Sequence, residues 1–197
     1  MTKRNGQTLI ELLVAMFVIS IGLFGAVGIV YSNLALVNRD TDEVTVVNLA
    51  REGVELAKEA RDSNWIAGNS FDQGFESGSD YSATPVWNGI LATPSFDFTA
   101  NTVTDTQAAV IQLVPTSTAP GFYANLNMGA GITGNSTLFH RLLTFHPICS
   151  DESVLNSGAI CAGALTKIGI RVESHIEWTR QGITKDFTIY SDLYDWR

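Results

Sequence analysis

An uncharged apolar run near the N-terminus constrains this chain more than any other feature. From Leu12 to Asn38 no residue carries a formal charge, a stretch of 27 residues. About 20 helical residues are enough to cross a bilayer core, so one transmembrane span is expected here. Lys3 and Arg4 precede the run, whereas Arg39 behind it is followed at once by acidic residues. The positive-inside bias therefore predicts a cytoplasmic N-terminus, with the rest of the chain on the other side.

Glu11 is a single carboxylate at the head of this apolar run. An ionised group at bilayer depth costs about 2.5–3.5 kcal/mol on insertion scales, and it persists mainly when it has a partner or a function. An opposite charge nearby would attract this carboxylate strongly in a low-dielectric helix bundle, while the carboxylate alone would be costly.

The residues around Glu11 resemble a known processing signal. Residues 3–11, KRNGQTLIE, are similar to the N-terminal signal of type IV prepilins and of the pseudopilins of type II secretion systems. The resemblance implies cleavage by a prepilin peptidase between Gly6 and Gln7 and N-methylation of the new amine on Gln7. It also implies that Glu11 neutralises the amine of a neighbouring subunit during assembly. The implied partners are other pilin or pseudopilin subunits, the peptidase, the membrane and an inner-membrane assembly platform.

An ordinary secretory signal is an alternative interpretation of the same residues. Lys3 and Arg4 would form its basic region, Leu12 to Gly25 its apolar region, and Ala26-Val27-Gly28 its small-residue cleavage site. Glu11 at the mouth of the apolar region, and an apolar run that continues past that site, argue against it. An uncleaved signal anchor is the next candidate.

Three glycines recur at every third position within the apolar run, at Gly22, Gly25 and Gly28. Glycine lowers helix stability and permits close approach of backbones. Two interpretations stay open: a transmembrane helix that simply tolerates glycine, or a stem that packs, bends or locally unwinds in a filament.

Apolar and small residues continue at helical spacing beyond the membrane segment. The predicted stripe consists of Val44, Val47, Ala50, Val54 and Ala57. One helix from about residue 7 to residue 62 is therefore expected. The stretches AREGVE at 50–55 and RDSNW at 61–65 also resemble minor pilins of the PilV and GspI kind.

The composition changes after residue 62. Residues 63–140 contain no Lys or Arg and five acidic residues. Residues 68–84 are expected to form a long surface connection, and strands are expected at 96–103, 108–114 and 138–145.

Alternation of side chains predicts a hairpin near the C-terminus. Mostly apolar residues at the even positions from Ile168 to Trp178 alternate with polar residues, and a turn is expected around residues 180–182. In the second strand Ile183, Phe187, Ile189 and Leu193 should share one face. The expected fold is therefore α+β and pilin-like, with a long N-terminal helix packed against an antiparallel β-sheet.

The two cysteines, Cys149 and Cys161, lie twelve residues apart and outside the membrane in the predicted topology. A disulfide is expected, closing a loop and contributing about 3 kcal/mol in the chain-entropy model. Free structural thiols and half of a metal site remain alternatives, although no further cysteine or well-spaced histidine completes a set of metal ligands. No metal and no cofactor is expected.

The spacing of residues in the sequence predicts no catalytic site. His140 and His146 share one face of an expected strand, but no nucleophile, base and orienting residue can be combined with them. No phosphate-binding loop and no paired-histidine metal motif is present in the sequence, so the chain is not expected to be an enzyme.

Charge argues against nucleic acid as the principal ligand. The net charge is −8, and the loss of Lys3 and Arg4 with a leader would leave ten basic and twenty acidic side chains. Nucleic acid is bound through clustered Lys and Arg. A basic strip near Arg171, Arg180 and Lys185 keeps DNA uptake as a secondary hypothesis.

The expected organisation has four parts: a leader over residues 1–6, an apolar membrane and assembly stem over 7–38, an amphipathic helical half over 39–62 and a β-rich globular head over 63–197. The expected function is that of a structural subunit, of the minor-pilin kind, assembling from a bacterial cytoplasmic membrane into a periplasmic or extracellular type IV pilus-like filament. A pseudopilin of a secretion or competence system is the runner-up. A signal-anchored monomeric surface domain that binds a ligand is the alternative from another class.

Overall fold

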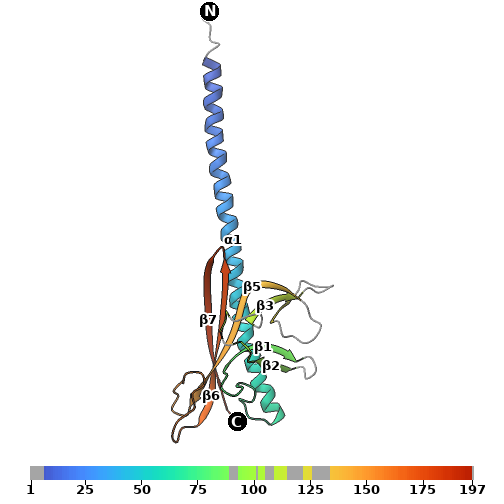
Figure 1. Ribbon diagram of the computed structural model, residues 1–197. Coiled ribbons are helices and arrows are strands. Elements are labelled where there is room, and N and C mark those ends of the chain that lie inside the picture. Colours follow the sequence, from blue (N-terminus) through green and yellow to red (C-terminus); the bar gives the residue numbers. More distant parts are fainter. Residues whose placement is uncertain are drawn as a thin grey trace, which may run out of the picture. The chain divides into compact units, whose positions relative to one another are not determined.

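The computed structural model describes residues 7–88, 93–100, 102–104, 109–114, 122–125 and 134–196. Over these residues the chain forms one helix, α1, followed by seven strands (Figure 1). The predicted α+β class, a long N-terminal helix followed by an antiparallel sheet, is confirmed. Contacts divide the chain into two compact units, Met1–Thr45 and Val46–Arg197, which we call the first and second units.

Helix α1 runs from Gln7 to Ala67, a length of 61 residues, and ends five residues later than predicted. Burial of Trp65 in the second unit favours the extra turn, because tertiary packing outweighs the modest helix preference of the preceding Ser and Asn. Gly68, with a φ of 75°, then ends the helix. Its N–H donates to the carbonyl of Trp65 at 3.1 Å, and the N–H of Asn69 donates to the carbonyl of Asn64 at 2.9 Å, which is the Schellman pattern.

In the first unit α1 carries large apolar side chains around its whole circumference. Between Leu9 and Val37 these side chains expose 49–79% of their surface. By length and composition α1 is able to cross a membrane, and its most apolar window is not buried in the protein. The hydroxyl of Ser20 donates within the helix to the carbonyl of Met16 at 2.7 Å, so this polar side chain needs no partner from outside.

Strand β5 organises the antiparallel sheet of the second unit. Along one edge it pairs with β6, which in turn pairs with β7. Along the other edge it pairs with β3 near its start and with β1 just past its middle, and these two strands pair with β4 and β2, respectively. The strands are β1 Ser82–Asn88, β2 Thr93–Asp97, β3 Val110–Val114, β4 Phe122–Asn125, β5 Asn135–Cys149, β6 Lys167–Arg180 and β7 Ile183–Tyr194.

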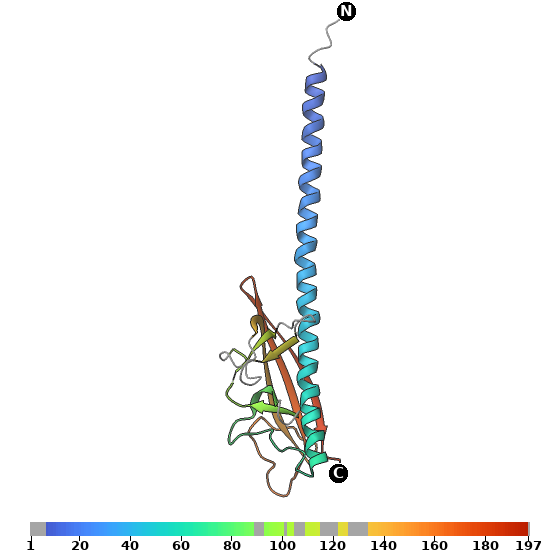
Figure 2. The same cartoon turned by 90° about the vertical axis from the view of Figure 1, so that its right-hand side faces the viewer.

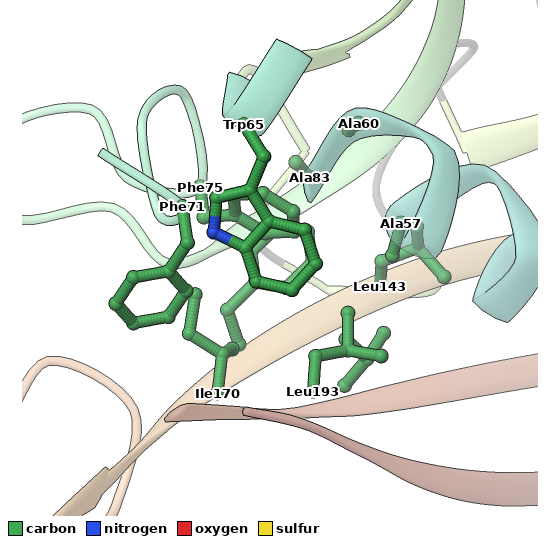
Figure 3. Close-up of a cluster of buried hydrophobic side chains, with 11 residues drawn as sticks. Ala57, Ala60, Trp65, Phe71, Phe75, Ala83, Leu143, Ile170 and Leu193 are labelled. Atoms are coloured by element: carbon green, nitrogen blue, oxygen red, sulfur yellow. The ribbon is translucent and has the colours of Figure 1, made fainter. Parts of the chain in front are cut away.

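Residues 46–67 of α1 pack on one face of this sheet in two clusters (Figure 2). The first cluster joins Val46 and Leu49 to Trp178 near the end of β6. The second cluster joins Trp65, at the end of α1, to Ile170 near the start of β6. Figure 3 shows the Trp65 indole reaching from the helix toward Ile170. Strand β6 therefore runs antiparallel to this part of α1.

Gly53 lies at a close approach of α1 to the sheet. A Cβ atom at this position would be 2.8 Å from Leu143 Cδ2 and 2.8 Å from Ser174 Oγ. Only glycine fits this approach without a shift of the neighbouring side chains. The predicted helical stripe is wrong at its first member, because Val44 exposes 63% of its surface while the contacting face includes Val46.

Residues 68–84 were expected to form a surface connection, and this prediction is wrong in part. Phe71 and Phe75 are buried, and the ring of Phe75 packs edge-on against the ring of Phe145 with centroids 5.0 Å apart. The segment then enters β1, where Ala83 is fully buried. Aromatic packing across a long sequence separation outweighs the local turn signals that suggested a loop.

The other expected strands are partly correct. The strand expected at 108–114 is observed as β3, and those expected at 138–145 and 168–178 are observed with longer bounds as β5 and β6. The strand expected at 96–103 ends at Asp97 as β2, because a turn follows at 98–99. In β7 the side chain of Leu193 is buried as expected, but Ile183 exposes 65% because it lies at the hairpin turn.

Candidate functional site

The residues of the implied processing signal lie at and before the start of α1. Gly6 lies outside the described residues, and Gln7 is the first residue of the helix. Glu11 follows one turn later and is exposed, between the exposed apolar side chains of Ile10 and Leu12. In the sequence Glu11 is the sole charged residue between Arg4 and Arg39. A carboxylate in this setting meets no protein partner of opposite charge along its own apolar helix segment.

Past the apolar run, α1 regains charged residues that pair along the helix. In the first unit Arg39 Nε donates to Glu43 Oε1 at 3.2 Å. In the second unit Lys58 Nζ lies 2.8 Å from Glu55 Oε1. Such exposed pairs contribute only a few tenths of a kcal/mol each. They therefore mark the water-exposed length of the helix rather than a binding site.

Arg141 of β5 is a buried cation at the interface between sheet and helix in the second unit. Its Nη1 donates to the main-chain carbonyl of Leu49 at 3.1 Å and to Glu52 Oε2 at 2.8 Å, both on α1. Its Nη2 donates to Asn125 Oδ1 of β4 at 2.8 Å. A buried guanidinium must be paired in this way, because its desolvation would otherwise be very costly. One side chain thus joins α1, β5 and β4.

Sequence reasoning missed the role of Arg141, although a signal was available. Phe139, Leu143 and Phe145 alternate along one face of β5, and Arg141 occupies the same parity as these apolar residues. A lone charge on the apolar face of an alternating strand indicates a buried pair. The identity of its partners on α1 could not be read from the sequence.

The predicted disulfide is present. Cys149, the last residue of β5, is bonded to Cys161 in the loop that leads to β6. Main-chain bonds also hold this loop, since the N–H of Cys149 donates to the carbonyl of Ser153 and the N–H of Leu155 donates to the carbonyl of Pro147, each at 2.9 Å. Both cysteines of the sequence are used, so the alternatives of free thiols and of a cysteine metal site are wrong.

All three histidines lie on the sheet face opposite α1. His146 Nε2 lies 3.1 Å from Glu173 Oε2, and its Nδ1 lies 3.3 Å from the carbonyl oxygen of Leu155. Buried ring nitrogens of His140 and His175 have no hydrogen-bond partner among the described residues. Within the same described part of the chain, no group of three metal-ligating side chains is placed to hold an ion.

Two ion pairs link the first half of β6 to neighbouring elements and lower carboxyl pKa values. Burial alone would raise the pKa of Asp72, but hydrogen bonds from Lys167 and Ser70 lower it below its ordinary value. Arg171 lies opposite Asp192 on β7 and donates to both carboxylate oxygens, at 2.6 and 2.8 Å. This bidentate contact lowers the pKa of Asp192 and raises the pKa of Arg171.

Comparison with known proteins bears on the N-terminal segment alone. Residues 1–27 match the family model described as the prokaryotic N-terminal methylation motif, which is the prepilin signal of type IV pilins and pseudopilins. No curated protein and no solved structure matches the chain. The chain therefore carries a prepilin-type signal joined to a helix able to span a membrane, and this motif supports a type IV pilin-like or pseudopilin precursor. Proteins with this motif are structural subunits that are processed by a prepilin peptidase and assemble with other pilin subunits.

Proposed function

We propose that this protein is a structural subunit, of the minor-pilin kind, that is cut after Gly6 and assembles through α1 into a type IV pilus or pilus-like filament. The proposal rests on one observation: the methylation motif continues directly into an apolar helical segment in which Glu11 is the single charged residue. The second unit, with its disulfide, would be the part displayed outside the membrane.

The proposed sequence of events follows from charge. Before assembly the stem lies in the membrane with its N-terminus in the cytoplasm, as the positions of Lys3 and Arg4 favour. Cleavage creates an amine on Gln7, which is then N-methylated. In the filament Glu11 of one subunit neutralises that amine of a neighbour, since each charge is costly alone in a low-dielectric bundle.

The proposed domain organisation is the leader 1–6, the stem 7–38, the amphipathic part 39–62 and the β-rich head 63–197. The apolar side chains that α1 exposes between Leu9 and Val37 support the stem assignment, because a filament core or a bilayer would cover them. The exported location is supported by the disulfide, which persists in oxidising compartments.

The test is substitution of Glu11 by Ala, with Glu55→Ala as the matched control. Glu55 is an exposed carboxylate on the same helix but outside the apolar run. We expect Glu11→Ala to leave membrane insertion, cleavage at Gly6 and the fold of the second unit intact, since it only makes the stem more apolar. Incorporation into sheared filaments should fall at least tenfold, because breaking a buried charge pair costs about 3–5 kcal/mol. Glu55→Ala should incorporate normally.

The readout is the ratio of filament-bound to membrane-bound subunit, together with mass spectrometry of the mature N-terminus. Equal incorporation of Glu11→Ala and the parent would contradict the assembly role of the carboxylate. A mature chain that begins at Met1, or beyond Gly28, would contradict prepilin processing itself and favour the signal anchor or the ordinary secretory signal.

A further inference from the structure

Strand β7 forms a long outer edge of the sheet in the second unit. It extends over twelve residues, and among the described strands it pairs with β6 alone. It contains no proline, and its pairing with β6 continues without a register shift. The outer strands on the other side of the sheet, β2 and β4, are five and four residues long, and β2 contains Pro94. Short strands, prolines and bulges are the usual protection of a sheet edge, and β7 has none of them.

The hydrogen-bond pattern shows which main-chain groups of β7 point away from β6. In an antiparallel pair, every second pair of opposite residues exchanges hydrogen bonds. The N–H of Asp195 donates to the carbonyl of Ile168 at 2.8 Å, and these two residues continue the register of the β6–β7 pairing. The odd-numbered residues of β7 therefore bond to β6. The even-numbered residues from Thr184 to Tyr194 direct their N–H and C=O groups outward, and we call these groups the outer edge of β7.

The outer edge offers main-chain donors and acceptors beside an uncharged stretch of strand. Within the part of the chain that the structure describes, no other main-chain group bonds to it. From Phe187 to Ser191 the strand carries no charged side chain. Thr188 and Tyr190 lie on the sheet face opposite α1, whereas Phe187 and Ile189 are half-buried on the α1 face. Such an edge is suited to the addition of a further strand.

The charges near the outer edge indicate what it binds. Asp186 is exposed and lies directly opposite Glu177 of β6, and like charges opposite one another weaken a sheet. A basic side chain opposite Asp186 on an added strand would relieve this repulsion. A second copy of this chain, with its net charge of −8, would be repelled instead. On the α1 face, the added strand would lie beside Phe187 and Ile189, so apolar side chains are required there.

We propose that the outer edge of β7 binds an extended segment of a different protein, in which basic and apolar residues alternate, as an added antiparallel strand. Its basic residues lie on the face of Asp186, and its apolar residues lie beside Phe187 and Ile189. Antiparallel pairing is the more stable arrangement per residue. Main-chain hydrogen bonds supply the affinity, and the alternation supplies the specificity. The contact is confined to the second unit and does not depend on cleavage at Gly6 or on Glu11.

The experiment uses the full chain in micelles of an uncharged detergent, with a capped synthetic peptide that alternates lysine and valine as the probe. Two further peptides carry methyl groups on the main-chain nitrogens of either the lysines or the valines, so they are matched in charge. Directly opposite residues of an antiparallel pair share a face. The lysine N–H groups therefore point toward β7, and the valine N–H groups point away from it.

We expect methylation of the lysine nitrogens to weaken binding at least about tenfold, because several main-chain hydrogen bonds are lost. Methylation of the valine nitrogens should leave the affinity within about threefold of the parent peptide, because those nitrogens donate to water. Calorimetric titration measures both affinities. The proposal is overturned if the lysine-methylated peptide binds as tightly as the valine-methylated peptide.

Thr188→Pro tests the outer edge on the protein, with Thr188→Ala as the matched control. The N–H of Thr188 points away from β6, so proline removes a donor from the outer edge and no hydrogen bond from the β6–β7 pairing. Thr188→Pro should weaken binding of the lysine-valine peptide at least about tenfold, and Thr188→Ala should leave it unchanged. Asp186→Asn should weaken it about threefold.

Tryptophan fluorescence during denaturant unfolding reports whether Thr188→Pro is folded, and if it is not, the two methylated peptides decide the question on the parent chain. A folded Thr188→Pro variant that binds the lysine-valine peptide as tightly as the parent overturns the proposal. Sedimentation of the parent without peptide tests the other occupant. A dimer that Thr188→Pro dissociates would overturn the assignment to a different protein and give the outer edge to a second copy of this chain.

Discussion

The two parts of helix α1 cover their apolar side chains in different ways. Between Leu9 and Val37 the helix exposes large apolar side chains on every side and depends on a bilayer or on other helices to cover them. Between Val46 and Ala67 it buries only one face, built largely from small residues, against its own sheet. The difference teaches that one continuous helix can carry an association surface at one end and a finished core at the other.

The largest loss of folding stability is expected from Arg141→Met, which removes the contact of this side chain between sheet and helix in the second unit and leaves the apolar stem unchanged. The substitution removes the guanidinium donor from the buried Asn125 side chain and from the Leu49 carbonyl, which costs about 1–3 kcal/mol for each buried group that loses its partner, while Glu52 stays partly in solvent. Tryptophan fluorescence during denaturant unfolding in detergent reports this loss, because all four tryptophans lie in the second unit.

The control for Arg141→Met is Lys58→Met, which removes an exposed cation paired with Glu55. It should change the free energy of unfolding by less than about 1 kcal/mol. Insertion of α1 into membranes should be the same for both variants. Similar unfolding midpoints for Arg141→Met and the parent would show that this side chain does not hold sheet and helix together.

A smaller change in stability is expected from adding one methyl group to α1. Stability should fall when the methyl group is added between Val46 and Ala67, and rise when it is added between Leu9 and Val37. In Gly53→Ala the new Cβ meets Leu143 and Ser174 at 2.8 Å, so overpacking of about 1–3 kcal/mol outweighs the gain of about 1 kcal/mol in helix propensity. In Gly25→Ala no described atom lies within 4 Å of the new Cβ, so helix propensity alone acts and stability rises.

Unfolding of the second unit followed by fluorescence tests Gly53→Ala, and helicity of the detergent-solubilised chain by circular dichroism tests Gly25→Ala. Gly53→Val should destabilise further than Gly53→Ala. A Gly53→Ala variant more stable than the parent would mean that the helix and the sheet can separate at this point without cost.

The smallest effect is a dependence of stability on pH that belongs to the second unit. The pKa of Asp72 is lowered in the folded state by hydrogen bonds from Lys167 and Ser70, against the opposing effect of burial, and the pKa of Asp192 is lowered by Arg171. Carboxyls with lowered pKa values contribute stability that is fully present above their ordinary pKa of 3.8. This contribution is lost as the pH falls below 3.8 through the lowered values.

Denaturant unfolding at neutral pH and near pH 3 measures this contribution. Asp72→Asn should lower stability at neutral pH and reduce the difference between the two pH values. An unchanged pH dependence in Asp72→Asn and in Asp192→Asn would show that these pairs are too solvated to matter.

The elements with strong local periodicity could be predicted from the sequence, and those fixed by distant contacts could not. The uncharged run predicted the long helix, the alternation from Ile168 to Trp178 predicted β6, and the spacing of the cysteines predicted the disulfide. The helical stripe was wrong at Val44, where the buried face begins instead with Val46, because the close approach at Gly53 and the bonds of Arg141 set the rotation of α1 on the sheet.

The functional and buried residues likewise fall into those that a local motif predicted and those whose position depends on distant contacts. A short linear motif specifies the processing signal, so residues 3–11 indicated it without any structure, and the match over residues 1–27 agrees. The buried position of Phe71 and Phe75 depends on Phe145, about seventy residues away in the sequence, and no local pattern contains that information.

The sharing of α1 between both units has a mechanical consequence. A pull along the helix axis reaches the second unit through residues 46–67, whose contacts with β6 are spread along the antiparallel strand from Ile170 to Trp178. Such a pull acts parallel to the contact surface, so both clusters and the bonds of Arg141 resist it together and do not fail one after another. The second unit is therefore built to resist tension applied through its helix, while a force that lifts the helix away from the sheet would meet these contacts one at a time.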